Sequence, residues 1–198
     1  MRRTDWLLVG LLALLIVAVV SIFLLLRDRG EAIETIQEVM HTPTAMNAYT
    51  SAVPVARQWA NDAVLYSITT ALQSPFLQEN DFVNWDFTFY SAELQETALL
   101  SINDSQVTLI STRLAQDSLQ PGNLAGWLVD SPAAIGQMMT IGGEEFLEQQ
   151  GQATLVLALR SSPAFVWQGT LVNTATHATL GLEISAENGE LKQIQQTR

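Results

Sequence analysis

Two histidines and a small set of carboxylates are the residues of this sequence whose chemistry suits catalysis or metal binding. His41 and His177 lie far apart, and neither has a second metal ligand four positions away. A nucleophilic triad would place a histidine beside a serine and a carboxylate, but the sequence contains no Gly-x-Ser-x-Gly motif. We therefore interpret both histidines as solvated surface residues.

The acidic residues and a glycine pair form no recognisable ligand pattern. Glu144 and Glu145 are neighbours on a predicted helix and point in different directions, and Asp81 and Asp86 lie near the ends of predicted strands. No spacing resembles a calcium loop, and Gly142-Gly143 lacks the Lys-Ser/Thr of a phosphate-binding loop. The sequence thus predicts no catalytic, cofactor-binding or metal-binding residues, and no enzymatic activity.

Four tryptophans offer a different site, an aromatic cleft for a ligand: Trp59, Trp85, Trp127 and Trp167. Packing explains three of them without a ligand, because Trp85 and Trp167 begin equivalent strands and Trp59 falls on the helix face predicted to cover the sheet. Trp127 lies in the connection between two predicted units. We expect it to seal their junction.

The charge of the chain after Arg29 excludes several classes of partner. This part carries five basic and 18 acidic residues, a net charge of −13. A surface of that sign repels phosphate backbones and anionic headgroups, so we predict no nucleic-acid binding and no flat docking on a membrane. The expected partners are basic, neutral or metal-bearing, and a protein partner is predicted. The chain has no cysteine, which excludes disulfides and a lipid attached through a processed cysteine.

The N-terminal region has the composition of a membrane span. Residues 6–26 run for 21 positions without a charge, and a helix rising about 1.5 Å per residue would cross roughly 30 Å. A cleaved signal peptide is the alternative, but the run is longer than a signal core, and its exit LLLRDR lacks small residues. We therefore predict a transmembrane signal anchor at 1–30, with a cytoplasmic N-terminus and an extracytoplasmic C-terminal domain.

The next segment, 31–50, is predicted to be a juxtamembrane helix and a linker. Ile33, Ile36 and Val39 recur at helical spacing between Glu31 and Thr42. The stretch from Thr42 to Thr50 has a proline, small residues and no clear period, which is typical of a linker.

Two tryptophans mark an internal repeat. Trp85 begins WDFTFYSAELQETALLSI and Trp167 begins WQGTLVNTATHATLGLEI, and the two segments align without a gap. Equivalent positions include Thr88 and Thr170, Phe89 and Leu171, Ala98 and Leu180, Leu100 and Leu182, and Ile102 and Ile184. Apolar and polar residues alternate within them, which predicts one β-hairpin with a buried face, used twice.

A helix and a strand precede each predicted hairpin, and a final strand follows it. The first helix is predicted to begin near Ser51 with Pro54 in its first turn, and the second to be capped by Asp130 of Asp130-Ser131-Pro132. We predict that the second helix breaks at Gly142-Gly143 and resumes over Glu144–Gln150. The predicted strands are 64–68, 154–159, 107–110 and 191–194, the last after a two-residue turn at Asn188-Gly189.

This order of elements, ending in ENGELKQI over Glu187–Ile194, resembles the PepSY domain, a small module of peptidase propeptides and bacterial envelope proteins. The resemblance covers residues 51–198, as one unit at 51–115 and a second at 116–198, each with a cystatin-like helix packed on an antiparallel sheet. The first unit departs from the pattern, because Asn103-Asp104-Ser105-Gln106 replaces the acidic Gly turn. The resemblance implies a binding or regulatory role, in some members the restraint of a peptidase, and carries over no catalytic residues.

The predicted fold class is therefore α+β, with one N-terminal transmembrane helix followed by two tandem helix-plus-antiparallel-sheet units. Two functions fit it. The first is a membrane-anchored extracytoplasmic binding or regulatory module without catalytic activity, acting on a peptidase or an envelope protein. The second is an accessory structural subunit of a larger membrane complex, with the anchor and the helix from Glu31 to Thr42 packed on other subunits. In both, residues 6–26 are the predicted contact with the membrane.

Overall fold

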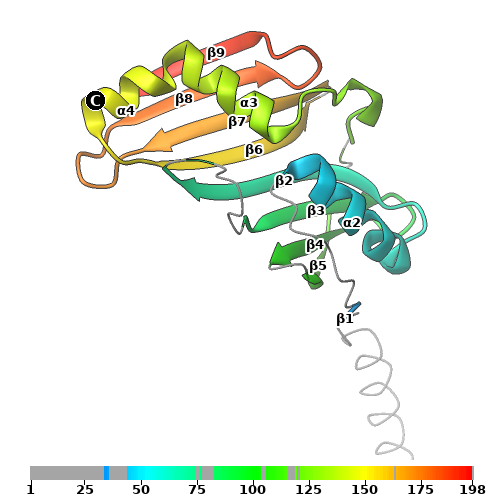
Figure 1. Cartoon of the computed structure of the whole chain (residues 1–198). Coiled ribbons are helices and arrows are strands. Elements are labelled where there is room, and N and C mark those ends of the chain that lie inside the picture. The colour runs from blue at the N-terminus through cyan, green and yellow to red at the C-terminus, as the bar shows by residue number, and fades with distance from the viewer. Residues whose placement is uncertain are drawn as a thin grey trace, which may run out of the picture. The chain divides into compact units, whose positions relative to one another are not determined.

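One antiparallel sheet organises the described part of the chain (Figure 1). The computed structural model describes residues 34–35, 44–74, 76, 83–103, 106–115, 119, 121–162 and 164–197. The strands are β1 (Glu34–Thr35), β2 (Val64–Gln73), β3 (Trp85–Ser91), β4 (Glu96–Asn103), β5 (Gln106–Leu114), β6 (Thr154–Ser162), β7 (Ala164–Val172), β8 (Thr179–Ser185) and β9 (Leu191–Thr197). Their spatial order is β1-β5-β4-β3-β2-β6-β7-β8-β9, so β9 forms one edge of the sheet.

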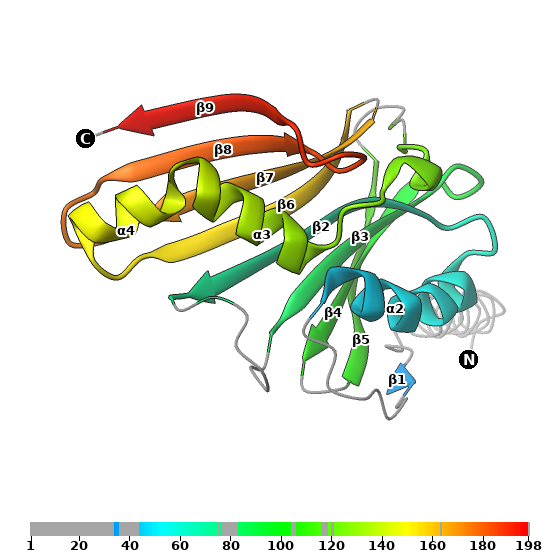
Figure 2. The ribbon, with the colours of Figure 1, turned by 45° about the horizontal axis from the view of Figure 1, so that its top comes forward.

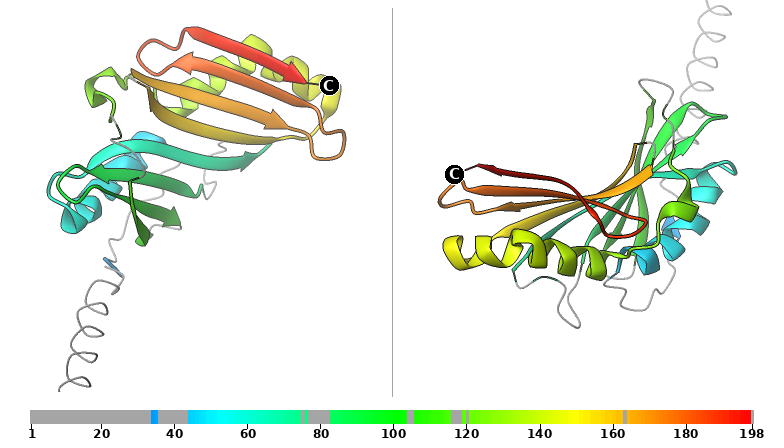
Figure 3. Two further views of the ribbon diagram at one scale, coloured as in Figure 1. Left: turned by 180° about the vertical axis from the view of Figure 1, so that it is seen from behind. Right: turned by 90° about the horizontal axis from the view of Figure 1, so that it is seen from above.

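The described helices all lie on the same face of this sheet, as the view from above shows (Figure 3). They are α2 (Ala45–Trp59), the short 3-10 helix η1 (Leu124–Gly126), α3 (Ser131–Met138), the π-helical turn η2 (Met139–Gly143) and α4 (Glu144–Gln150). The helix α2 covers the half of the sheet that contains β3 to β5, and α3 and α4 cover the half that contains β7 and β8 (Figure 2). The other face of the sheet carries none of these helices.

The sheet order reveals two halves with the same plan, each a helical segment followed by four strands. They meet at the centre, where β2 and β6 pair from Ser67↔Arg160 to Gln73↔Thr154. The predicted equivalence of the hairpins is confirmed, since Trp85 pairs with Ile102 in the first half and Trp167 pairs with Ile184 in the second. Both tryptophans are fully buried beneath the helices.

The two halves fill their cores in opposite ways. In the first half the helix α2 contributes small side chains, mainly alanines, to the core, and the sheet contributes large ones, among them Phe87 and Phe89. In the second half the helix supplies bulk through Met138, and the strand position equivalent to Phe87 is Gly169. A Cβ atom on Gly169 would overlap the sulfur of the buried Met138 side chain, so the glycine leaves room for that side chain.

The N-termini of α2 and α3 meet at Asp130, the N-cap residue of α3. The Asp130 carboxylate accepts hydrogen bonds from the Ser131 backbone N–H at 2.6 Å and from the Met46 backbone N–H at 3.1 Å. The Ser131 hydroxyl accepts a third, from the Ala45 N–H at 2.9 Å. A negative charge is favourable where two helix N-termini converge, so this cap ties the two halves together.

The predicted fold class is wrong in two respects. The repeat units do not form two sheets, because β2 and β6 join them into one. Within the described ranges no helix is long and apolar enough to cross a bilayer, which contradicts the predicted single-pass transmembrane fold and localisation. The described fold is instead one antiparallel sheet with helices on one face. The predicted span at 6–26 lies outside the described residues.

Two predictions for the segment 31–50 are also wrong. Glu34–Thr35 forms the short strand β1 against β5, where a helix was expected, and the rest of 31–43 lies outside the described residues. Ala45–Thr50 belongs to α2, where a linker was expected. This first turn is stabilised by the Thr44 cap and by Asp130 and Ser131, which are remote in the sequence.

Two predicted turns differ from the structure. The chain does not break at Gly142-Gly143 but stays helical through η2, where Gly143 allows the Met139 side chain to approach closely. The predicted two-residue turn at Asn188-Gly189 is a longer loop, closed by a 2.8 Å hydrogen bond from the Ser185 N–H to the Glu190 carbonyl. Gly189 adopts a φ of 75°, which favours glycine at that position.

Candidate binding surface

The helix-free face of the sheet, called the open face below, is lined with polar side chains. Strand periodicity places on it the residues that alternate with the core. They include two apolar residues, Leu99 and Val156, and a larger polar set: Thr69, Asp86, Thr88, Arg160, Gln168, Thr170, Glu183, Gln193 and Gln195. A sheet with one face packed and the other solvated normally shows this alternation. Three depressions lie along this face, so it is the candidate site of the described domain.

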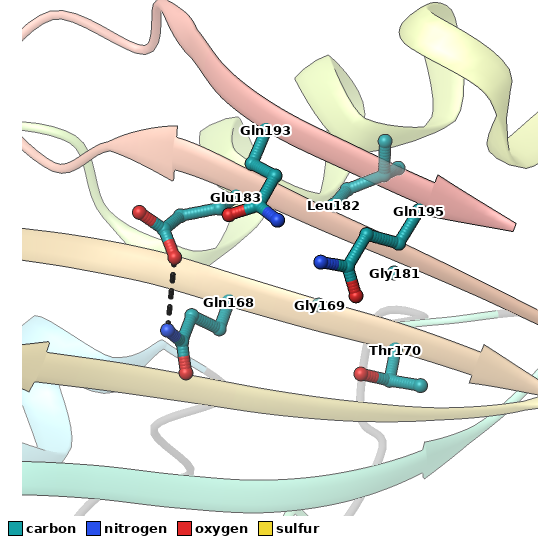
Figure 4. A pocket seen from close by; sticks show the side chains of 8 residues that line it. All are labelled: Gln168, Gly169, Thr170, Gly181, Leu182, Glu183, Gln193 and Gln195. Atoms are coloured by element: carbon teal, nitrogen blue, oxygen red, sulfur yellow. Dashed lines mark hydrogen bonds between the residues drawn. The ribbon is translucent and has the colours of Figure 1, made fainter.

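The first depression spans β7, β8 and β9 and has a volume of about 260 Å³. Figure 4 shows its lining, in which glutamine side chains from β7 and β9 surround two glycines. Gln168 donates a hydrogen bond from Nε2 to Glu183 Oε2 at 2.9 Å, which fixes the orientation of both side chains. Each amide offers donors and an acceptor, so the depression can bind neutral polar groups of either kind.

The depression exists because Gly181 has no side chain. A Cβ atom built there would meet its nearest neighbours, the carbonyl oxygen and Cβ of Gln195, at 3.7 and 3.8 Å, which is ordinary contact distance. The equivalent position in the first half is Leu99 on β4, which carries a side chain where Gly181 has none. The second half of the sheet therefore has a hollow where the first half has an apolar side chain.

The second depression lies at the centre of the open face, across the junction of the two halves, with a volume of about 530 Å³. Its lining combines hydroxyl groups, a tyrosine, one cation and one carboxylate: Tyr66, Ser67, Thr69, Arg160, Ser161, Val166, Gln168 and Glu183. Gln168 and Glu183 line both depressions, so the two hollows form one continuous polar track from β2 to β9.

The third depression, of about 480 Å³, lies on β4 and β5 and is lined by Ser101, Asn103, Gln106, Thr108 and Ile110. Its lining carries no charged side chain. The charged groups of these depressions, Arg160 and Glu183, are thus concentrated at and beyond the centre of the sheet.

The residues considered for catalysis are scattered. His177 is exposed in the loop between β7 and β8, at a φ of 60°, and Glu144 and Glu145 are exposed on α4. Asp86 is exposed on the open face of β3, while His41 and Asp81 lie outside the described residues. The described residues contain no group of three or more His, Cys, Asp or Glu side chains placed to hold a metal ion.

Trp85, Trp127 and Trp167 are buried in the core, Trp59 is half-buried and packs against it, and Trp127 connects the halves. Its ring lies 5.6 Å from the Tyr49 ring of α2 and 6.3 Å from the Trp167 ring of β7. The indole N–H groups of Trp127 and Trp167 both donate to the Val129 carbonyl, at 3.0 and 2.8 Å. The predicted role of Trp127 at the junction is confirmed.

Prediction from sequence missed the open face as a site. The signal was present in β7, where Gln168 and Thr170 alternate with the core residues Trp167, Gly169 and Leu171. Polar residues at alternating positions are normal for any half-exposed strand, so the pattern alone does not single them out. Their meaning depends on which strands are neighbours and on the absence of a helix above them.

Comparison with known proteins supports the fold. No family model matches the chain, and none of the curated proteins matches its sequence. Its structure is similar to the crystal structure of a "putative lipoprotein" from Clostridium difficile 630, with a TM-score of 0.52 and 10% sequence identity. The similarity covers 83% of this chain and 99% of that protein. At this identity the similarity shows the fold alone.

Proposed function

We propose that this domain is a non-catalytic binding module that acts outside the cytoplasm at a membrane surface and holds a protein partner on the open face of its sheet. The observation that carries the proposal is the asymmetry of the sheet. Every described helix packs on one face, while the depressions lie along the other. A broad polar face of this kind suits recognition of another chain rather than enclosure of a small molecule.

The chemistry of the open face indicates the kind of partner. Amide and hydroxyl side chains dominate the track from β2 to β9, and they match the donors and acceptors of a polypeptide backbone. Arg160 and Glu183 add one charge of each sign. Because the chain after Arg29 carries a net charge of −13, a basic or neutral partner is favoured over an acidic one.

The proposed location draws its support from the similar fold of the Clostridium difficile protein, which is described as a "putative lipoprotein". The resemblance to the PepSY domain supports a peptidase or an envelope protein as the partner, and a regulatory effect on it. A protease added to intact spheroplasts should digest the domain. Full protection of the domain would contradict the proposed location.

The binding proposal is tested by crosslinking in whole cells, followed by mass spectrometry of what is recovered with the chain. Gly181→Val adds a side chain to the first depression, starting from a Cβ at ordinary contact distances, and Arg160→Ala removes the cation of the second. Each variant should reduce partner recovery by about tenfold, the effect of losing one well-placed interface residue.

The matched control is Gln137→Ala, an exposed position on α3 and therefore on the helix side. It should leave recovery unchanged. Equal recovery by all variants would exclude the open face as the binding surface. Recovery of no partner by the natural sequence would contradict the proposal as a whole.

A further inference from the structure

Among the residues that the structure describes, the outer edge of β9 is a second surface of the sheet without a partner. All seven residues of β9 are exposed, and β8 pairs with only one of its edges. Leu191 and Ile194 lie on the helix side of the strand and are 45% and 51% exposed. An edge strand with free backbone donors and acceptors is a template for pairing with another strand.

Natural edges are usually protected by charge, proline or a bulge, and β9 has little protection. Its single charge is Lys192, which lies at the bulge opposite Glu183 and Ile184. From Gln193 to Thr197 the strand carries no charge and no proline. This uncharged stretch lies in a chain with a formal net charge of −11, so neutrality is a local property of the edge.

The sequence of β9 is complementary to itself when two copies run antiparallel about Ile194. In that register Ile194 faces Ile194, Gln193 faces Gln195, and Lys192 faces Gln196. No like charges oppose each other, the glutamine amides can exchange hydrogen bonds, and the two half-exposed isoleucines cover one another on the helix side. A shift of one residue in the axis, to Gln193, would instead place Lys192 against Ile194.

We propose that β9 is a homodimer interface, at which a second copy of this chain adds its own β9 antiparallel in the register centred on Ile194. The interface is isologous, and it extends the sheet across two chains. It does not depend on a partner bound to the open face.

The charge of the chain sets the behaviour of this dimer. Two chains of net charge −11 repel each other at long range, while the contact itself is neutral apart from Lys192. Salt screens the repulsion and leaves the strand pairing and the Ile194 contact in place. The dimer should therefore be weak, concentration-dependent and favoured by added salt.

Single cysteines provide a direct test, because the chain has none of its own. Oxidation of the Ile194→Cys chain should give a disulfide-linked dimer. The register is tested by mixing Gln193→Cys and Gln195→Cys chains, which should crosslink with each other more strongly than either does with itself. Leu114→Cys is the matched control, since it is 76% exposed on β5 at the other end of the sheet, and it should not crosslink.

Sedimentation equilibrium of the natural 198-residue sequence at low and high salt gives a second measurement. Ile194→Lys should raise the dimer Kd by about tenfold or more, because it sets two like charges opposite each other. Circular dichroism verifies that this half-exposed position tolerates the change. A natural chain that stays monomeric at high salt, a dimer unaffected by Ile194→Lys, or preferential crosslinking through Leu114→Cys would each overturn the proposal.

Discussion

Single residues decide what each face of this sheet can do, and two glycines on neighbouring strands show it. Gly169 faces the helices and leaves room for Met138, whereas Gly181 faces the open side and leaves a hollow beside Gln195. Both would be read from sequence as weak points of a strand. The structure shows that one is needed for packing and the other for the shape of the surface.

This difference predicts opposite outcomes for the same substitution. Gly169→Ala should destabilise the domain by about 1–3 kcal/mol, because its Cβ would overlap the Met138 sulfur in a packed core. Gly181→Ala should change stability by less than about 0.5 kcal/mol, because its Cβ has ordinary contacts. Urea unfolding measures both, and equal losses would contradict the assignment of the two glycines to opposite faces.

Asp62 is the residue whose ionisation is most clearly linked to a local structure. Hydrogen bonds from the Ser91 hydroxyl, at 2.6 Å, and from the Glu93 N–H, at 2.8 Å, stabilise its carboxylate and lower its pKa below the ordinary value of 3.8. Because the folded pKa is the lower one, the stabilisation is present above pH 3.8 and is lost as pH falls through the folded value.

The test compares the natural sequence with Asp62→Asn by urea unfolding between pH 7 and pH 2. The natural domain should lose more stability than the variant below about pH 4, the region in which an aspartate titrates. Parallel pH profiles would show that Asp62 contributes nothing in this range. An NMR titration of the Asp62 carboxyl gives the folded pKa directly.

At the scale of elements, the meeting of two helix N-termini at Asp130 explains how the halves are fixed to each other. Asp130→Ala removes the acceptor for N–H groups of both α2 and α3, and should cost about 1–2 kcal/mol. The matched control is Thr44→Ala, which removes a single exposed cap bond of 3.3 Å and should cost less. Urea unfolding measures the loss of stability in both variants. Equal losses would show that Asp130 does no more than cap one helix.

The same elements show why prediction from sequence succeeded in part. The hairpins were predicted correctly because alternation around Trp85 and Trp167 is local and strong. The first turn of α2 was missed because its buried positions are alanines with little hydrophobic contrast, and because two of its backbone donors bond to Ser131 and Asp130, which are remote in the sequence. The π-helical turn was missed because a glycine pair predicts a break unless the packing of Met139 is known.

The open face could not be predicted from the sequence, again because it depends on contacts between residues that are remote in the sequence. Its central depression is built from β2 and β6, whose pairing joins Ser67 to Arg160 across most of the domain. Alternation identifies which residues share a face of one strand. It does not identify which strands are neighbours or which face the helices leave free.

At the scale of the whole molecule, one sheet with a shared helix cap should unfold as one unit. Phe87→Ala, in the first half, should cost about 3–5 kcal/mol, and Gly169→Ala about 1–3 kcal/mol in the second. In each variant, tryptophan fluorescence and far-ultraviolet circular dichroism should report the same single transition in urea. Two separate transitions in either variant would show that the halves unfold independently.

The different placement of the large side chains in the two halves, on the strand in the first and on the helix in the second, should also disfavour mispairing while the chain folds. Two similar repeats in one polypeptide invite mispairing, in which each helix docks on the other repeat's strands. Met138 set against Phe87 would collide, and the alanine face of α2 set over Gly169 would enclose an empty space. The steric collision and the empty cavity occur only in the swapped arrangement. The difference in shape between the two repeats therefore favours the correct pairing of each helix with its own strands.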